Sequence, residues 1–315
     1  MKSISIIVPC FNEARNVANF YEAIMREQWR QISSNYEIIF IDDGSTDSTI
    51  AEIKKLQSID KNIRLVKFSR NFGKESAMLA GLKSAKNELI TVMDCDLQDP
   101  PSLLSQMLEI YNANVDSSGA GRVKMIVAKR KNRKGEGKIR AFFSEIFYKI
   151  NNALSSTKII SGVRDFRLME REVVQSILQM DEYHRFSKAI FEFVGFEKRY
   201  LEYEYIARES GESKWSFMKL LRYGLGGIIS FSITPLRAIT MIGIVIFVLS
   251  GAWGSYILLK ALIFGDPVKG YPSLMVLVSF FGGLQIIMLG IIGEYIGRIY
   301  EQGKGRPHYI IEYQN

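Results

Sequence analysis

Two long stretches without a charged side chain constrain the last third of this 315-residue chain more than any other feature. Residues 239–259 and residues 273–293 each run for 21 residues without Asp, Glu, Lys or Arg. A helix of about 20 apolar residues is long enough to cross a hydrocarbon core ~30 Å thick. The stretches therefore predict a two-span transmembrane hairpin within residues 235–300, followed by a tail at residues 301–315.

The charges around these stretches predict how the hairpin is oriented. The loop from Gly265 to Pro272 holds only Asp266 and Lys269. The basic residues Lys214, Lys219, Arg222 and Arg237 flank the first stretch, and Arg298, Lys304 and Arg306 follow the second. Because Lys and Arg collect on the cytoplasmic side, we expect a multi-pass protein with both termini in the cytoplasm. A net charge of +8 suits either nucleic acid or anionic lipid. The two spans favour lipid, so we predict a membrane partner and no nucleic acid.

The segment just before the hairpin differs from both neighbours. Residues 215–234 mix aromatic and leucine side chains with Lys219 and Arg222, and Pro235 closes the segment. This composition predicts an interfacial amphipathic segment lying on the membrane. Glycines within the second stretch permit close packing of helices, which leaves a homo-oligomer open.

The first two thirds of the chain alternate between strand and helix patterns. Strand patterns occupy residues 3–9, 36–41, 63–68 and 89–93, and helical patterns occupy residues 12–31, 47–58 and 74–85. This alternation predicts an α/β domain, residues 1–214, with a parallel sheet covered by helices on both faces. Ligands bind beyond the carboxyl ends of such strands. Pro9, Asp42 and Asp94 all fall at those ends, so we expect one site there.

The strand at residues 89–93 leads into a run of oxygen-bearing side chains. Asp94, Asp96 and Gln98 alternate where the chain leaves the sheet. Hard oxygen ligands of this kind suit Mg²⁺ or Mn²⁺, with water and substrate phosphates completing the shell. The alternative is a solvated acidic loop in which Asp99 caps the next helix and Pro100 lies in its first turn.

A second acidic pair, Asp42 and Asp43, precedes Gly44 and Ser45. A strand-to-helix turn explains the glycine and the serine, but two adjacent acids point to a ligand as well. A carboxylate here could accept hydrogen bonds from a nucleobase or a ribose. Cys10 and Cys95 are the two cysteines, which predicts neither a disulfide framework nor a zinc site.

Several motifs in order resemble an inverting glycosyltransferase family 2 domain with the Rossmann-like GT-A fold. They are Val8-Pro9 with Asn12-Glu13, Asp42-Asp43-Gly44-Ser45, Ser69 to Glu75, Asp94-x-Asp96-Leu97-Gln98-Asp99-Pro100, Arg164 to Met169, and Gly211 to Trp215. With the two spans, the chain is similar to the bacterial polyisoprenyl-phosphate glycosyltransferases of the GtrB and ArnC group, which are related to dolichol-phosphate mannose synthase. The resemblance covers nearly the whole chain.

The resemblance implies roles for particular residues. Nucleotide-sugar contacts fall on Pro9, Asn12, Glu13, Asp42, Lys74, Asp94, Arg208 and Lys214. The phosphate of the lipid acceptor falls on Arg130, Arg140 and Ser144, and the last two can share one helix face. Arginine suits this role because its guanidinium binds phosphate in a bidentate manner.

Asp165 matches the proposed catalytic base of the family. A phosphate monoester is largely ionised at neutral pH, so Asp165 either accepts a proton or only orients the acceptor. A third interpretation pairs this acid with Arg164 or Arg167. Many relatives carry glycine before this aspartate, and this chain carries Arg164 there.

The resemblance implies an enzyme that transfers a sugar, with glucose from UDP-glucose as the expected donor, to a polyisoprenyl phosphate such as undecaprenyl phosphate. The reaction would take place at the cytoplasmic face of the bacterial inner membrane and supply lipid-linked sugar for cell-envelope glycans. One alternative is a processive polysaccharide synthase, which normally has more spans and a Gln-x-x-Arg-Trp motif. The other is a non-catalytic membrane scaffold that binds nucleotide sugars.

Overall fold

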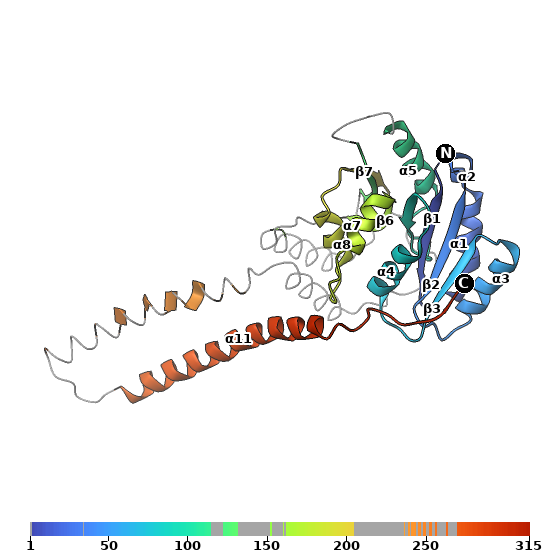
Figure 1. The fold of residues 1–315 in the computed structure, drawn as a ribbon. Coiled ribbons are helices and arrows are strands. Elements are labelled where there is room, and N and C mark those ends of the chain that lie inside the picture. The colour runs from blue at the N-terminus through green and yellow to red at the C-terminus, as the bar shows by residue number, and fades with distance from the viewer. Residues whose placement is uncertain are drawn as a thin grey trace.

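The computed structural model describes residues 2–33, 35–114, 122–131, 152, 160, 162–204, isolated positions between 236 and 263, and 270–315. Four parallel strands form the centre of one sheet (Figure 1). They lie side by side in the order β4-β1-β2-β3. Their bounds are Ile4–Cys10 for β1, Tyr36–Asp42 for β2, Ile63–Phe68 for β3 and Leu89–Val92 for β4. The four predicted strands are confirmed to within a residue at each end.

The full sheet is mixed, so the prediction of a parallel sheet was wrong for its outer part. Strand β6 (Val163–Glu170) runs antiparallel to both β4 and β5 (Met125–Arg130), and β7 (Lys198–Tyr203) is parallel to β5. At the other edge, β8 (Ile311–Gln314) pairs antiparallel with β3. Buried strands of either direction carry similar apolar runs, so such a run does not reveal the direction of its strand.

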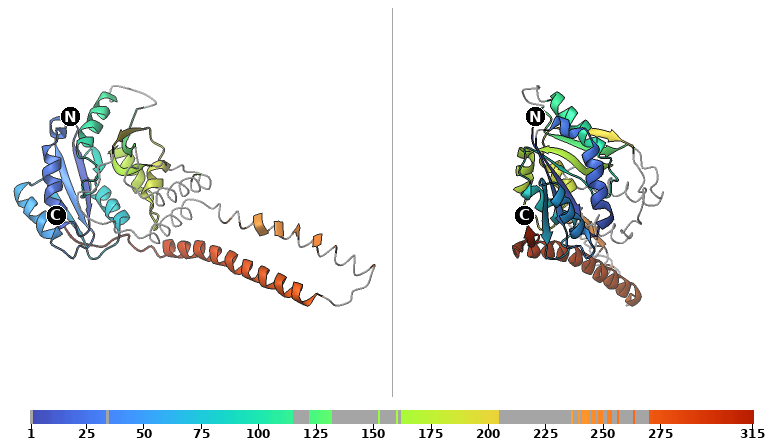
Figure 2. Two further views of the ribbon diagram at one scale, coloured as in Figure 1. Left: turned by 180° about the vertical axis from the view of Figure 1, so that it is seen from behind. Right: turned by 90° about the vertical axis from the view of Figure 1, so that its right-hand side faces the viewer.

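Helices cover both faces of the sheet, as predicted (Figures 1 and 2). Side chains alternate along each strand, so Ile6 and Ile38 belong to one buried cluster and Ile7 and Ile39 to the other. The first cluster packs against α1 (Ala14–Arg26), α3 (Thr49–Ile59) and α5 (Ser102–Asn114). The second packs against α4 (Lys74–Ser84), α7 (Arg171–Leu178) and α8 (Ser187–Phe193).

Two details of this packing depend on single residues. A Cβ placed on Gly81 would lie 2.1 Å from the Cγ2 atom of Ile7, so the glycine lets α4 approach β1 closely. The helix predicted for residues 12–31 is broken, because α1 ends at Arg26 and a short α2 (Trp29–Ile32) follows. The break lets Trp29 become fully buried while its indole N–H donates to the carbonyl of Ile24 at 2.6 Å.

The helix α11 (Tyr271–Gly303) extends away from the α/β domain (Figure 1). It contains the second predicted stretch, and its residues Phe280–Gly303 are long and apolar enough to cross a membrane. It is the one helix that meets this test within the described ranges. About half of the first stretch and all of residues 215–234 lie outside those ranges.

The chain returns from α11 to the sheet through its last residues. Gln302 donates to the carbonyl of Asp181 at 2.8 Å, which joins the end of α11 to the loop before α8. Further along, the ring of Tyr309 stacks on Phe68 with centroids 4.8 Å apart. Strand β8 then completes the sheet edge, so the end of α11 is attached to the α/β domain by polar, aromatic and strand contacts.

Candidate functional site

The loops that follow β1 and β2 are held together at the carboxyl edge of the sheet. The backbone N–H of Asn12 donates to the hydroxyl of Ser45 at 2.9 Å, and the side-chain carbonyl of Asn12 accepts from the N–H of Thr46 at 2.8 Å. The N–H of Glu13 donates to Thr49 at 2.9 Å. Asn12 has a left-handed backbone with φ of 55°, which asparagine tolerates better than most residues. These predicted nucleotide contacts thus also fix the loop geometry.

Pro9 lies inside β1, a central strand, at a position where the missing N–H does little harm. The pairing of β1 with β4 ends at Ile7, whereas its pairing with β2 continues to Cys10. Proline therefore lies where β1 begins to separate from β4. Asp94 follows β4 at this same end of the sheet.

Asp42 is completely buried at the end of β2. Its Oδ2 atom accepts from the N–H of Ser45 at 3.2 Å, but its Oδ1 atom has no hydrogen-bond partner among the described residues. Burial raises the pKa of this carboxyl. A buried oxygen without a donor costs free energy, which a ligand N–H or O–H would recover. This feature fits the predicted contact with a nucleoside.

Asp43 organises the loop between β3 and α4. Its Oδ1 atom accepts from the N–H of Phe72 at 2.7 Å, and its Oδ2 atom accepts from the N–H of Gly73 at 2.9 Å. Gly44 permits this arrangement, because it has φ of 72° and a Cβ on it would lie 2.5 Å from the carbonyl carbon of Arg70. The sequence pattern indicated a turn at these positions but not its contact with the next loop.

The pH dependence of stability should report the burial of Asp43. Burial, together with the neighbouring Asp42, raises the pKa of Asp43 to about 6. The folded state therefore favours the neutral carboxyl, and this contribution is lost as pH rises through about 6. We expect the stability of Asp43→Asn relative to wild type to improve by about 1 kcal/mol between pH 5 and pH 8. Chemical denaturation at both pH values measures this difference, and a free energy of unfolding of the variant relative to wild type that stays constant or falls between pH 5 and pH 8 would contradict the assignment.

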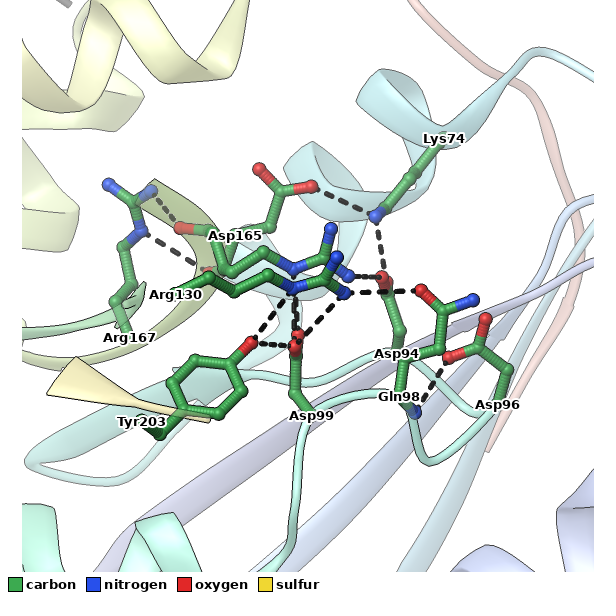
Figure 3. Close-up of polar contacts among 10 residues, drawn as sticks. Lys74, Asp94, Asp96, Gln98, Asp99, Arg130, Asp165, Arg167 and Tyr203 are labelled. Carbon is green, nitrogen blue, oxygen red and sulfur yellow. Dashed lines mark hydrogen bonds and ion pairs between the residues drawn. The ribbon is translucent and has the colours of Figure 1, made fainter. Parts of the chain in front are cut away.

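Lys74, the first residue of α4, connects two predicted site residues (Figure 3). Its Nζ atom lies 2.7 Å from Oδ1 of Asp94 and 2.9 Å from Oδ2 of Asp165. Asp94 follows β4, whereas Asp165 belongs to the antiparallel β6. Residues 71 positions apart thus meet at one amine. Among the three interpretations of Asp165, the geometry disfavours pairing with Arg164 or Arg167, because its carboxylate contacts Lys74.

The charges around Asp165 keep it ionised. Burial favours the neutral carboxyl, but Lys74 and Lys188 outweigh it and hold the pKa of Asp165 well below its ordinary value. Burial also opposes the charge on the amine, yet Asp165 and Asp94 raise the pKa of Lys74. Arg167 fixes the backbone here by donating to the carbonyl of Arg164 at 2.7 Å and to that of Asp165 at 3.2 Å.

The predicted metal ligands lie on the loop between β4 and α5. Gln98 donates its backbone N–H to Oδ1 of Asp96 at 3.2 Å, while its side-chain oxygen accepts from Arg130 at 3.3 Å. The described residues contain no cluster of three or more His, Cys, Asp or Glu side chains suited to a metal. The loop offers two carboxylates and one amide oxygen. That donor set fits a hard divalent ion which keeps positions for water and phosphate.

The expectation that Asp99 caps the next helix was wrong. Helix α5 begins at Ser102, and Asp99 is a buried acid that contacts three side chains instead. These are Arg164 at 3.1 Å, Arg130 at 3.8 Å, and the hydroxyl of Tyr203. Sequence reasoning named Arg130 for the acceptor and noted Arg164, but it did not find Tyr203. The alternating strand pattern near residue 203 was the available signal.

The remaining predicted contacts cannot be placed. Arg140 and Ser144, expected at the acceptor phosphate, lie outside the described residues. Arg208 and Lys214, expected at the donor phosphates, lie outside them too. The structure therefore brings together Lys74, Asp94 and Asp165, with Asp96, Gln98 and Arg130 beside them (Figure 3). Asn12, Glu13 and Asp42 form a second group at the ends of β1 and β2.

Comparison with known proteins finds relatives that match nearly the whole chain. Over 312 residues the chain is 42% identical to "Putative glycosyltransferase CsbB" of Bacillus subtilis, covering 99% of this chain and 92% of that protein. It is 41% identical over 309 residues to "Bactoprenol glucosyl transferase" of Shigella phage SfV, covering 98% of each. A "Prophage bactoprenol glucosyl transferase homolog" of Escherichia coli is also 41% identical, again over 98% of each chain.

Two family profiles match successive parts of the chain. Residues 5–178, which contain the four parallel strands and the Lys74–Asp94–Asp165 contact, match "Glycosyl transferase family 2". Residues 234–299, which contain both uncharged stretches, match "GtrB C-terminal hairpin". The chain therefore belongs to glycosyltransferase family 2, as a member that carries a GtrB-type C-terminal hairpin, and it is a glycosyltransferase.

Proposed function

We propose that this enzyme transfers glucose from UDP-glucose to a polyisoprenyl phosphate, such as undecaprenyl phosphate, at the cytoplasmic face of the membrane. The observation that carries the proposal is the meeting of Asp94 and Asp165 at Lys74, which puts a donor-side acid and an acceptor-side acid at one point. Relatives named for glucosyl transfer to bactoprenol, 41% identical over nearly their full length, support the sugar and the class of acceptor.

A divalent ion, Mg²⁺ or Mn²⁺, would be held by Asp94, Asp96 and Gln98, whose oxygen donors suit it. When bound, the ion would neutralise the diphosphate that leaves the sugar. Lys74 would have a related role. Its positively charged amine lies beside Asp94, so it would also neutralise a phosphate bound next to that residue. Asp42, with its buried and unpartnered Oδ1 atom, would receive an N–H or O–H of the nucleoside.

On the acceptor side, Asp165 would orient the lipid phosphate together with Arg130. The Arg130 side chain is mostly buried and lies beside Gln98. It can therefore reach a phosphate held next to the loop between β4 and α5, which we call the ligand loop. Arg140 and Ser144 would complete this side, and Arg208 and Lys214 would contact the donor phosphates. The phosphate oxygen would then attack the sugar carbon from the face opposite the leaving diphosphate, which inverts the anomeric centre.

A donor panel tests this function. Purified enzyme in lipid nanodiscs that contain undecaprenyl phosphate is incubated with radiolabelled UDP-glucose, UDP-galactose, UDP-N-acetylglucosamine or GDP-mannose. We expect label to enter the organic phase with UDP-glucose, and only when the lipid phosphate is present. Transfer from another donor alone would correct the sugar. Label in an insoluble polymer would instead favour a processive synthase.

The topology of the hairpin gives a separate prediction. Two spans with basic flanks place the loop between them, residues 265–272, on the periplasmic side, with both termini in the cytoplasm. Ser273 adjoins this loop, so a single cysteine placed there, in a variant that lacks Cys10 and Cys95, should react with an impermeant maleimide added to intact cells. A cysteine at position 304 should react only after the cells are opened. The reverse pattern would overturn the orientation.

A further inference from the structure

One buried acid, Asp99, connects the ligand loop to the ends of the strands β5, β6 and β7. Asp99 is 5% exposed and lies where the ends of β5, β6 and β7 meet the loop after β4. Nε of Arg164 donates to its two carboxylate oxygens at 3.1 and 3.2 Å, and the hydroxyl of Tyr203 donates to Oδ1. Arg130 lies 3.8 Å from the same oxygen. Three adjacent strands thus each bring one side chain to a single carboxylate, two as hydrogen-bond donors and Arg130 as an ion pair.

The ligand loop contains a residue with a strained backbone two positions before Asp99. Leu97 lies between two predicted ligands, Asp96 and Gln98, and has φ of 56°. A left-handed backbone costs a residue other than glycine about 1 kcal/mol, so surrounding contacts must hold it. On one side Leu97 packs against the buried cluster beneath it. On the other side, Gln98 accepts a hydrogen bond from Arg130, and Asp99 is held by Arg164 and Tyr203.

Each arginine that contacts Asp99 also reaches a predicted ligand. Arg164 extends from Asp99 toward Asp94, with its second nitrogen 3.8 Å from Oδ2 of that residue. Arg130 extends from Asp99 to Gln98, donating to its side-chain oxygen at 3.3 Å. Asp94 and Gln98, the first and last members of the ligand set, are therefore each connected to Asp99 through the guanidinium of a different arginine (Figure 3).

We propose that Asp99 is a positioning residue which sets the geometry of Asp94, Asp96 and Gln98 for the divalent ion. The inference rests on the proposed function only in taking these three residues as the metal ligands. Asp99 also retains two positive charges that would otherwise be drawn to the ligand oxygens. Without its charge, Arg164 would pair more strongly with Asp94, and Arg130 with Gln98, so both arginines would compete with the metal.

The chain offers a matched control for the loss of a buried carboxylate. Glu37 is 7% exposed near the start of β2, at the amino ends of the parallel strands, where it accepts from Arg64 at 2.7 Å and from the hydroxyl of Ser5 at 2.6 Å. Glu37→Gln and Asp99→Asn each remove one buried charge that is paired with arginine. Both variants should lose stability, but only Asp99→Asn should affect the ligand loop.

Binding of Mn²⁺ alone, measured by the electron paramagnetic resonance signal of the free ion, tests the proposal without turnover. We expect Asp99→Asn to weaken Mn²⁺ binding by at least about tenfold, as is typical for partners that orient metal ligands, and Glu37→Gln to leave it unchanged. If Asp99→Asn does not fold, Tyr203→Phe takes its place, since it removes one donor to Asp99 and keeps the ring. About threefold weaker binding is then expected.

The outcomes separate this inference from the proposed function. Wild-type affinity in Asp99→Asn, or in Tyr203→Phe where that variant is used, would overturn the positioning role while leaving the metal site intact. Equal weakening in Asp99→Asn and Glu37→Gln would also overturn it, because the effect would then follow from general destabilisation. Lack of Mn²⁺ binding by the wild-type enzyme would instead remove the metal site, and this inference with it.

Discussion

Asp96→Asn is expected to lower the rate of glucosyl transfer by at least about tenfold, and a chelator such as EDTA to abolish it. The substitution removes one of the two carboxylates among the predicted metal ligands and leaves a side chain of almost the same size. The charge of the leaving diphosphate would then be poorly neutralised. Rates of transfer to lipid, measured over a range of Mg²⁺ and Mn²⁺ concentrations, test both effects.

The chelation experiment needs a control that removes an acid outside the loop. Glu172 lies in α7, where it is exposed and forms an ion pair with Lys124. Glu172→Gln should keep wild-type rates at all metal concentrations. Excess metal should restore activity after EDTA in the wild type, and only in part in Asp96→Asn. Full turnover in EDTA would exclude a metal-dependent mechanism for this enzyme.

Asp165→Asn is expected to give the second large effect, a loss of kcat of roughly tenfold to a hundredfold with little change in the KM for UDP-glucose. Lys74 and Lys188 hold the pKa of Asp165 well below its ordinary value, which makes it a weak proton acceptor. We therefore expect it to orient an acceptor phosphate that is already ionised. The ratio of wild-type to variant kcat should then be constant between about pH 6 and pH 9.

A general base would behave differently. Its loss would cost about a hundredfold to ten-thousandfold, and the wild type would show a titration in kcat that the variant lacks. Single-turnover rates at several pH values distinguish the two roles, because they exclude product release. A pH-dependent ratio with a midpoint in this range would contradict the orienting role and favour catalysis by proton transfer.

The regular part of the fold could be predicted because its pattern is local. Alternating strands and helices over residues 3–93 give the four parallel strands, and the carboxyl-edge rule then places Asp42 and Asp94. The direction of β6 could not be obtained this way, since it depends on pairing with β4 and β5, which are distant in the sequence. Asp165 therefore reaches the site from a strand of opposite direction.

The candidate site likewise has one part that local sequence patterns predict and one part that depends on contacts distant in the sequence. Asp94, Asp96 and Gln98 could be proposed as ligands from the sequence because their spacing is itself the signal. The role of Asp99 was missed because a helix N-cap and a buried anion have the same local sequence, an aspartate before proline. Only the ends of β5, β6 and β7 decide between them, through Arg130, Arg164 and Tyr203.

The C-terminal part shows a further limit of sequence patterns. The uncharged stretch at residues 273–293 predicts a span, but α11 continues to Gly303, because charged residues beyond a membrane can remain helical. Strand β8 is four residues long and exposed, so its apolar content alone gives little indication of a strand. Its pairing with β3 provides the missing reason for its conformation.

The product of a single reaction tests the central claim most directly. Wild-type enzyme, UDP-glucose, Mg²⁺ and undecaprenyl phosphate are combined, and the lipid product is analysed by mass spectrometry and by NMR of its anomeric carbon. The predicted product is one glucose joined to the lipid phosphate with the β configuration, inverted from the α-linked donor. An α-linked product would contradict inversion, and recovery of unmodified lipid phosphate with free glucose would contradict transfer to this acceptor.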